Sequence, residues 1–198
     1  MDLTPAELKP RLVEELRRKL EANDMKLTTG FVGTAYLCRV LTQYGLNDIA
    51  YKLLLNEEMP GWLYEVKMGA TTVWERWNSI LPDGHLSDIS MNSLNHYAYG
   101  AIAEWMYRWM CGLNPMAKLP PRPGEGLNDA RASVRTASGV YESGWERKAD
   151  GSIAYRFRVP FNCEAILELP ESASAEVDGK AVSGAVTLKP GVHTAVTR

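Results

Sequence analysis

The first part of the chain carries apolar residues at the spacing of an α-helix. Leucines recur at every fourth position from Leu8 to Leu20, and charged residues fill the other faces. This spacing predicts an amphipathic helix with one buried stripe. Thr4 and Pro5 suit the N-cap and the first helical position, and Pro10 marks either a kink or the true start of the helix.

Four further helices are predicted in the same part of the chain, at about 31–44, 48–56, 72–78 and 92–111. The last of them is apolar on nearly every side, which is typical of a helix in an interior. Its two charged residues, Glu104 and Arg108, are spaced to form an ion pair. Charged outer helices with an apolar inner one indicate layered helices, as in an α/α barrel, although five helices are too few to close a barrel of twelve.

The pattern changes to period two after a segment rich in Pro and Gly. Residues 153–159 and 163–169 alternate apolar and polar side chains, as half-buried strands do. Asp150-Gly151 and Asp178-Gly179 are typical of tight hairpin turns. We therefore expect six to eight short antiparallel strands in a small β-sandwich.

These patterns predict an α+β chain with two domains. The helical domain covers 1–114, a linker covers 115–124, and the β-sandwich covers 125–198. The prolines of the linker cannot continue a helix, and its glycines loosen the chain.

Composition excludes several classes of protein. Apolar residues make up 45% of the 198 and charged residues 23%, which is the composition of a globular chain and not of a disordered one. The net charge of −2 gives no electrostatic reason to expect nucleic acid or an anionic membrane as a partner. No stretch is long and apolar enough to span a membrane, and the N-terminus does not resemble a signal peptide. The location is predicted as cytoplasmic or is left undetermined.

The three cysteines are too far apart in the sequence to suggest a zinc site or a disulfide framework. They are Cys38, Cys111 and Cys163, an odd number with no paired spacing. We expect them to be reduced thiols packed as small apolar side chains, in a reducing compartment or in no particular one.

The residues between Pro60 and Tyr97 are the densest in candidate chemistry. Tryptophans, carboxylates and amides occur together there, and this combination suits a carbohydrate site, because an indole covers the C–H face of a sugar while the polar groups bind its hydroxyls. Each residue also has a structural reading. Trp74 and Trp77 are three positions apart and fit a helix core, and Glu75 fits a capping box that begins at Thr72.

His96 likewise has two readings. It falls in the first turn of the predicted helix 92–111, where the positive end of the helix dipole favours a neutral imidazole. A neutral histidine can exchange one hydrogen bond with a sugar hydroxyl, or it can be a structural residue whose hydrogen bonds are satisfied inside the fold.

Several blocks of sequence, taken in order, resemble the C-terminal part of the bacterial α-L-rhamnosidases. They read LTTGFVGTAYLCRVLTQYG (27–45), AYKLLLNEEMPGW (50–62), GATTVWERWNSILPDG (69–84), MNSLNHYAYGAIAEWMYRWMCGL (91–113) and RASVRTASGVYESGWER (131–147). The resemblance covers the chain from about Met25 to its end. It implies part of an (α/α)6 barrel followed by a C-terminal β-sandwich.

The resemblance also implies an activity. Members of the family hydrolyse terminal α-L-rhamnosides with inversion, using a general acid and a general base on opposite faces of the sugar. The base carries over to Glu75, and the histidine that contacts rhamnose carries over to His96. Trp74 and Trp77 flank the base and are expected to shape the substrate pocket. No metal and no cofactor is implied, and the partner is a rhamnose-containing glycoside.

The chain also departs from the family pattern. The motif that supplies the general acid, with about seven barrel helices, is absent from this sequence. We therefore expect a chain that is catalytically incomplete alone and that self-associates to cover its open apolar face. The alternative is a structural or carbohydrate-binding remnant without catalysis. Should the chain prove active, the candidates for the acid are Glu65, Asp83 and Asp88.

Overall fold

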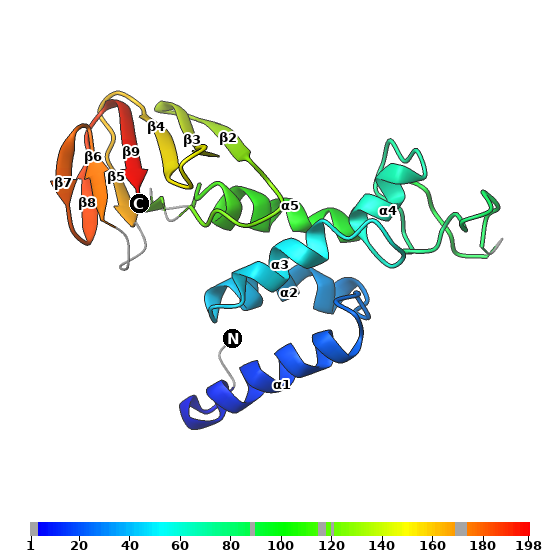
Figure 1. The fold of residues 1–198 in the computed structure, drawn as a ribbon. Coiled ribbons are helices and arrows are strands. Elements are labelled where there is room, and N and C mark those ends of the chain that lie inside the picture. Colours follow the sequence, from blue (N-terminus) through cyan, green and yellow to red (C-terminus); the bar gives the residue numbers. More distant parts are fainter. Residues whose placement is uncertain (1–3, 88–89, 115–117, 120, 169–173) are drawn as a thin grey trace. The chain divides into compact units, whose positions relative to one another are not determined.

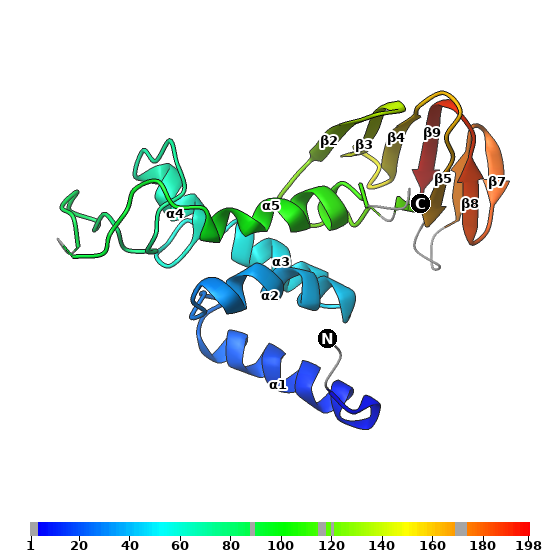
Figure 2. The same cartoon turned by 180° about the vertical axis from the view of Figure 1, so that it is seen from behind.

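The computed structural model describes residues 4–87, 90–114, 118–119, 121–168 and 174–198. Contacts divide the chain into two compact units, Met1–Ile102 and Ala103–Arg198. Figures 1 and 2 show that the first unit is helical and that the second holds the strands. The linker predicted at 115–124 stays a prediction, because residues 115–117 and 120 lie outside the described residues.

The described part of the helical unit includes α1 (Lys9–Ala22), α2 (Phe31–Gln43), α3 (Asn47–Leu54) and α4 (Trp62–Lys67). The prediction of α2 and α3 is confirmed to within two residues at each end. Pro10 lies in the first turn of α1, so it marks the start of the helix and not a kink. Within the described ranges, no side chain caps α1 or the short 3₁₀ turn before it, so the predicted cap at Thr4 is wrong.

Helices α2 and α3 form a hairpin because the chain reverses at Gly45. This glycine has a positive φ of 84°, and the N–H groups of Gly45 and Leu46 bond back to the carbonyls of Thr42 and Leu41. Leu41, Ile49 and Leu53 are fully buried between the two helices. Figure 1 shows the two helices packed against each other.

Helix α1 differs from its prediction in burial. Only Leu20 of the leucine stripe is buried, while Leu8 and Leu12 are about half exposed. The stripe has the period of a packed face, but the described part of the chain does not cover its first two turns.

The predicted helix 92–111 is shorter and irregular. It consists of a 3₁₀ turn at Ala98–Ala101, the helix α5 (Ile102–Trp105) and a π-helical turn at Met106–Met110. The expected ion pair of Glu104 with Arg108 is present at 3.0 Å. Some of its apolar side chains are exposed in this structure, so the prediction of a helix buried on all sides is wrong for the described chain.

The second unit is a sandwich of two sheets. The larger sheet has the strand order β2-β3-β4-β9-β6-β7 and the smaller has the order β1-β5-β8. The larger is antiparallel throughout, whereas β1 pairs with β5 in parallel in the smaller. The strands are β1 (Lys118–Leu119), β2 (Asp129–Thr136), β3 (Gly139–Arg147), β4 (Ile153–Val159), β5 (Ala165–Glu168), β6 (Ala175–Val177), β7 (Lys180–Val182), β8 (Ala185–Leu188) and β9 (Gly191–Thr197).

The inner face of the larger sheet is apolar, as the alternation predicts. Trp145, Tyr155 and Phe157 are buried on adjacent strands, and Leu167 and Leu188 are buried on the other sheet. The outer face of the larger sheet therefore carries the polar members of the alternation.

The hairpin turn between β6 and β7 is confirmed. Asp178 and Gly179 have φ values of 50° and 76°, as a turn that matches strand twist requires. The Asp178 carboxylate accepts the N–H of Thr194 at 2.9 Å and contacts His193 Nδ1 at 2.7 Å, while His193 Nε2 lies 2.7 Å from the carbonyl of Lys189. Burial lowers the pKa of His193, but the hydrogen bonds to Asp178 and Lys189 outweigh it, and the net pKa is raised. The turn is thereby tied to β9.

The cysteines are free thiols, as expected. Cys38 and Cys111 are buried, and burial raises their pKa values to about 12 and about 11. Within the described residues, no helix is long and apolar enough to cross a membrane.

Candidate active site

Glu75 lies in a bend of the backbone and not on a helix. The N–H of Glu75 donates to Ser93 O at 2.9 Å, and the N–H of His96 donates to Val73 O at 2.8 Å. The segments 72–75 and 93–96 therefore run side by side, so the predicted helix 72–78 is wrong. Local spacing suggested a helix, but the backbone groups pair with a segment about twenty residues away.

The carboxylate of Glu75 is held by this pairing. Its Oε2 accepts the backbone N–H of Ser93 at 2.7 Å, and the residue is half-buried. The hydroxyl of Thr72 donates to Leu94 O, so the two side chains do not form the capping box that the sequence allowed. Among the described residues, no partner is found for the other carboxylate oxygen of Glu75, which leaves it available to a ligand or to water.

His96 lies on the segment that pairs with the one carrying Glu75. Its Nδ1 accepts the N–H of Ala98 at 3.3 Å, so the neutral ring carries its proton on Nε2. The ring stacks on Phe31 at 4.9 Å and on Tyr97 at 5.0 Å between centroids. Nε2 is thus the nitrogen that can donate a hydrogen bond to a ligand.

An open hollow of about 630 Å³ lies beside His96. Thr72, Val73, Asn95, His96, Tyr97 and Gly100 line it. Glu75 does not line this hollow. The described residues thus bring Glu75 and His96 onto one pair of segments, and this hollow borders His96.

Trp74 and Trp77 pack against other residues of the helical unit. Trp74 is 2% exposed. Trp77 stacks on Tyr99 at 3.7 Å, meets Trp62 edge-on at 5.2 Å, and directs Nε1 to Thr29 O at 3.4 Å. Both indoles therefore pack in the helical unit, as the structural reading of their spacing allowed. Their contact with a sugar stays a prediction.

Glu65, from α4, is buried directly behind the paired segments. It is 4% exposed, and its Oε2 accepts the N–H of Trp74 at 3.2 Å. Its Oε1 is buried and has no hydrogen-bond partner among the described residues. Burial raises the pKa of this carboxyl to about 7, and the Trp74 N–H opposes the rise. The sequence signal for it was a single acid in the apolar run of α4, a helix that the sequence analysis missed.

Of the other two candidates for a general acid, the structure describes only Asp83. Asp83 is exposed and lies 3.3 Å from the ring of His85, which is also exposed. Asp88 lies outside the described residues. No group of three or more His, Cys, Asp or Glu residues in the described ranges could hold a metal ion.

Two family models match the chain. Residues 1–110 match the bacterial alpha-L-rhamnosidase 6 hairpin glycosidase domain, and residues 117–184 match the bacterial alpha-L-rhamnosidase C-terminal domain. The partial α/α barrel and the C-terminal β-sandwich predicted from the sequence are thereby confirmed.

Curated relatives agree with these matches. An alpha-L-rhamnosidase of Formosa agariphila is 40% identical over 196 residues, which is 95% of this chain and 21% of the relative. One from Streptomyces avermitilis is 39% identical over 176 residues, which is 86% of this chain and 17% of the relative. The chain thus spans about a fifth of the length of these relatives.

Solved structures show the same fold. The Streptomyces avermitilis alpha-L-rhamnosidase complexed with L-rhamnose is similar over 100% of this chain and 20% of its own, with a TM-score of 0.89 and 34% identity. The alpha-L-rhamnosidase of Aspergillus terreus is similar over 96% of this chain and 22% of its own, with a TM-score of 0.82 and 32% identity.

Proposed function

This chain belongs to the bacterial α-L-rhamnosidases, and we propose that it carries the general-base half of an inverting rhamnosidase site, with Glu75 as the base. The observation that carries the proposal is the anchored carboxylate of Glu75. One oxygen is fixed by the Ser93 N–H at 2.7 Å, and the other has no partner among the described residues. A carboxylate held in this way can accept a proton from water while the water attacks the anomeric carbon.

His96 and its surroundings supply substrate contacts in this proposal. The Nε2–H of the neutral ring can donate to a sugar hydroxyl, and the ring is held in place by Phe31 and Tyr97. Tyr97 is 87% exposed, so its ring is free to cover an apolar sugar face. The ligand is a terminal rhamnose of a glycoside.

The chain alone lacks the other half of the reaction. Inversion needs a second carboxyl group about 6.5–9.5 Å from the base, to protonate the leaving oxygen. The paired segments 72–75 and 93–96 contain no second acid, and Glu65 behind them is 4% exposed, so it is closed off from a substrate. Loss of a general acid costs about 10²–10⁴-fold in rate. By itself, this chain is thus expected to bind rhamnose weakly and to hydrolyse little glycoside.

The test is release of rhamnose from a chromogenic α-L-rhamnoside by the purified chain, by Glu75→Gln and by Glu14→Gln, an exposed acid on α1. We expect no release above the buffer rate from any of them, together with shifts of the Ser93 and His96 amide signals when L-rhamnose is added to the wild type. Release that Glu75→Gln leaves unchanged would contradict the role of Glu75 as base. Release lost only in Glu75→Gln would support that role and contradict the incompleteness of the chain.

We also propose that the purified chain self-associates through the helical unit. Several large apolar side chains of this unit are about half exposed or more: Leu8, Leu12, Phe31, Val32, Tyr36, Val66, Met91 and Tyr97. Isolated soluble proteins rarely expose large contiguous apolar patches. In a solution of this chain alone, a second copy of the chain is the partner that can bury these side chains.

Sedimentation at micromolar concentration measures this association. The expected result is a dimer or larger species that dissociates on dilution, and Val32→Lys is expected to shift it towards monomer. Val134→Lys, a half-exposed position on the β-sandwich, is the matched control and is expected to leave the association unchanged. A strictly monomeric profile of the wild type would contradict the proposal.

A further inference from the structure

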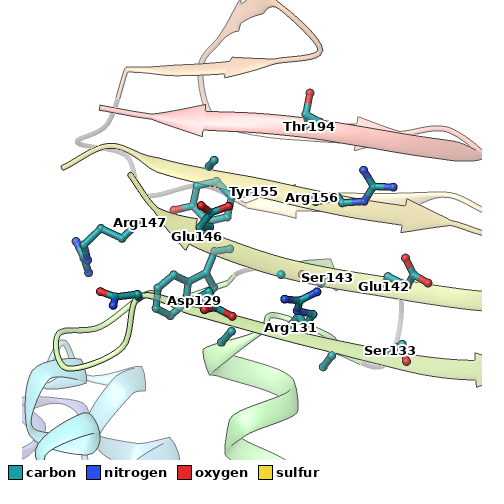
Figure 3. A pocket seen from close by; sticks show the side chains of 16 residues that line it. Asp129, Arg131, Ser133, Glu142, Ser143, Glu146, Arg147, Tyr155, Arg156 and Thr194 are labelled. Carbon is teal, nitrogen blue, oxygen red and sulfur yellow. The ribbon is translucent and has the colours of Figure 1, made fainter. Parts of the chain in front are cut away.

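The outer face of the larger sheet holds an open trough that the rhamnosidase site does not use. Its volume is about 1040 Å³, and the residues around it come from β2, β3, β4 and β9. Figure 3 shows Arg131 on β2 and Arg156 on β4, with β3 running between them. The trough therefore lies wholly within the second unit.

A single row of paired residues crosses the trough. Arg131 is paired with Gly144, Gly144 with Arg156, and Arg156 with Thr194. Because paired residues of a sheet point to the same face, the two guanidinium groups stand on one side of the sheet. Their backbones are two strand spacings apart, about 10 Å, which two arginine side chains can span to reach one anion.

Gly144 places no side chain between the two arginines. A Cβ at this position would lie 2.9 Å from Ala130 O and 2.9 Å from the Cβ of Arg131, so no side chain fits there. The floor of the trough between Arg131 and Arg156 is consequently bare backbone. A glycine inside a strand is typical of a place where another group comes close to the backbone.

The two arginines are not neutralised by the acids around them. Glu142 pairs with Arg158 at 3.6 Å, and Glu146 pairs with Lys148 at 2.9 Å. Among the described residues, no carboxylate lies within 4.0 Å of the guanidinium groups of Arg131 or Arg156. The trough thus presents two planar, forked donors that suit the oxygens of a carboxylate or sulfate.

The rest of the trough is mixed in charge. Asp129, Glu142 and Glu146 stand on the same face as the arginines, with the hydroxyls of Ser133 and Thr194. These interleaved acids would repel a polyanion such as nucleic acid. Carboxylates and hydroxyls can instead hold the neutral hydroxyls of a sugar.

We propose that this trough binds a saccharide carrying one carboxylate or sulfate group, with the anionic group between Arg131 and Arg156 and the sugar hydroxyls on the neighbouring polar side chains. The site is separate from Glu75 and His96, so it does not depend on catalysis by this chain. Its role is to hold an acidic sugar of a glycan on the β-sandwich.

The test is titration of the isotopically labelled chain with D-galacturonate, followed by amide signals. We expect shifts at Gly144, Arg131 and Arg156, with a dissociation constant of about 1 mM, the strength of a small polar ligand on an open surface. Inorganic sulfate and L-rhamnose serve as the anion without a sugar and the sugar without an anion. Each is expected to bind about tenfold or more weaker than galacturonate.

Arg131→Gln and Arg156→Gln are each expected to weaken galacturonate binding about tenfold or more, because each removes a charge-assisted hydrogen bond. Arg135→Gln is the matched control, since it lies on the same strand and face but does not line the trough. Retained signals outside the trough show that each variant is folded. Absence of binding in the wild type, equal binding of sulfate or rhamnose, or unchanged binding in both trough variants would overturn the proposal.

Discussion

Replacement of Glu65 by Gln is expected to raise the free energy of unfolding of the helical unit at pH 8 and to change it little at pH 4.5. Burial raises the pKa of this carboxyl from its ordinary 4.5 to about 7, with the Trp74 N–H opposing. In the unfolded chain the carboxyl ionises near pH 4.5, whereas in the folded chain it keeps its proton to about pH 7. The wild type therefore loses stability as the pH rises through this interval, by on the order of 3 kcal/mol above it.

Gln is close in shape to the protonated acid and can still accept the Trp74 N–H, so the variant avoids this loss. Urea unfolding followed by the signals of α2 and α3 at the two pH values measures the effect. Glu58→Gln is the control, because Glu58 is exposed and its hydrogen bond with Lys26 lowers its pKa. That pair stabilises above the unfolded pKa and the effect is lost as the pH falls, so Glu58→Gln is expected to lower stability slightly at pH 8 or leave it unchanged. Equal destabilisation by Glu65→Gln at both pH values would contradict the buried, protonated carboxyl.

The parts of the fold that the sequence predicted are those set by neighbours along the chain. Helix α2 ends where Gly45 supplies a positive φ, and the hairpin at Asp178 and Gly179 forms where two residues accept left-handed conformations. The apolar alternation of β4 places Tyr155 and Phe157 inside the sandwich. Each of these features depends on a few adjacent residues, so a local pattern suffices to find it.

The sequence-based predictions fail where contacts between segments far apart in the chain determine the local structure. The run from Thr72 has helical spacing, but its backbone pairs with residues 93–96 across a long loop. Helix α4 is six residues long, and its apolar residues gave no clear period. The burial of Glu65 depends on that helix packing behind Trp74, so no pattern near Glu65 could reveal it.

In the candidate site, too, some features could be predicted from the sequence and others depend on contacts between distant segments. Resemblance placed Glu75 and His96 in one site, and the structure places them on paired segments. The anchoring of the Glu75 carboxylate by Ser93, eighteen residues away, was not predictable, because the capping-box spacing favoured a local partner. The trough on the β-sandwich was not predicted either, since it depends on the register that brings Arg131, Gly144 and Arg156 into one row.

Replacement of Gly112 by Ala is expected to destabilise the second unit by about 3 kcal/mol or more. Gly112 has a φ of 77°, which costs any other residue about 1–2 kcal/mol. An added Cβ would lie 2.5 Å from the nitrogen of Pro121 and 2.8 Å from its Cδ, and Pro121 is fully buried. Overpacking of this kind costs a further 1–3 kcal/mol or so. The neighbouring carbonyls of Met110 and Cys111 accept hydrogen bonds from Trp145 and Ser143, so the chain cannot shift aside freely.

Gly179→Ala separates the cost of the positive φ from the cost of the contact with Pro121. Gly179 has nearly the same φ, 76°, and lies in the same unit, but a Cβ there would meet nothing within 4 Å. It is expected to lower the melting temperature by about 4–8 °C, the effect of roughly 1 kcal/mol in a unit of this size. Gly112→Ala is expected to lower it at least twice as far, since both variants force alanine into the same left-handed conformation and only one meets Pro121. Equal losses would mean that the segment around Pro121 moves away at little cost, and that the end of the helical stretch is not held against the sandwich by Trp145 and Ser143.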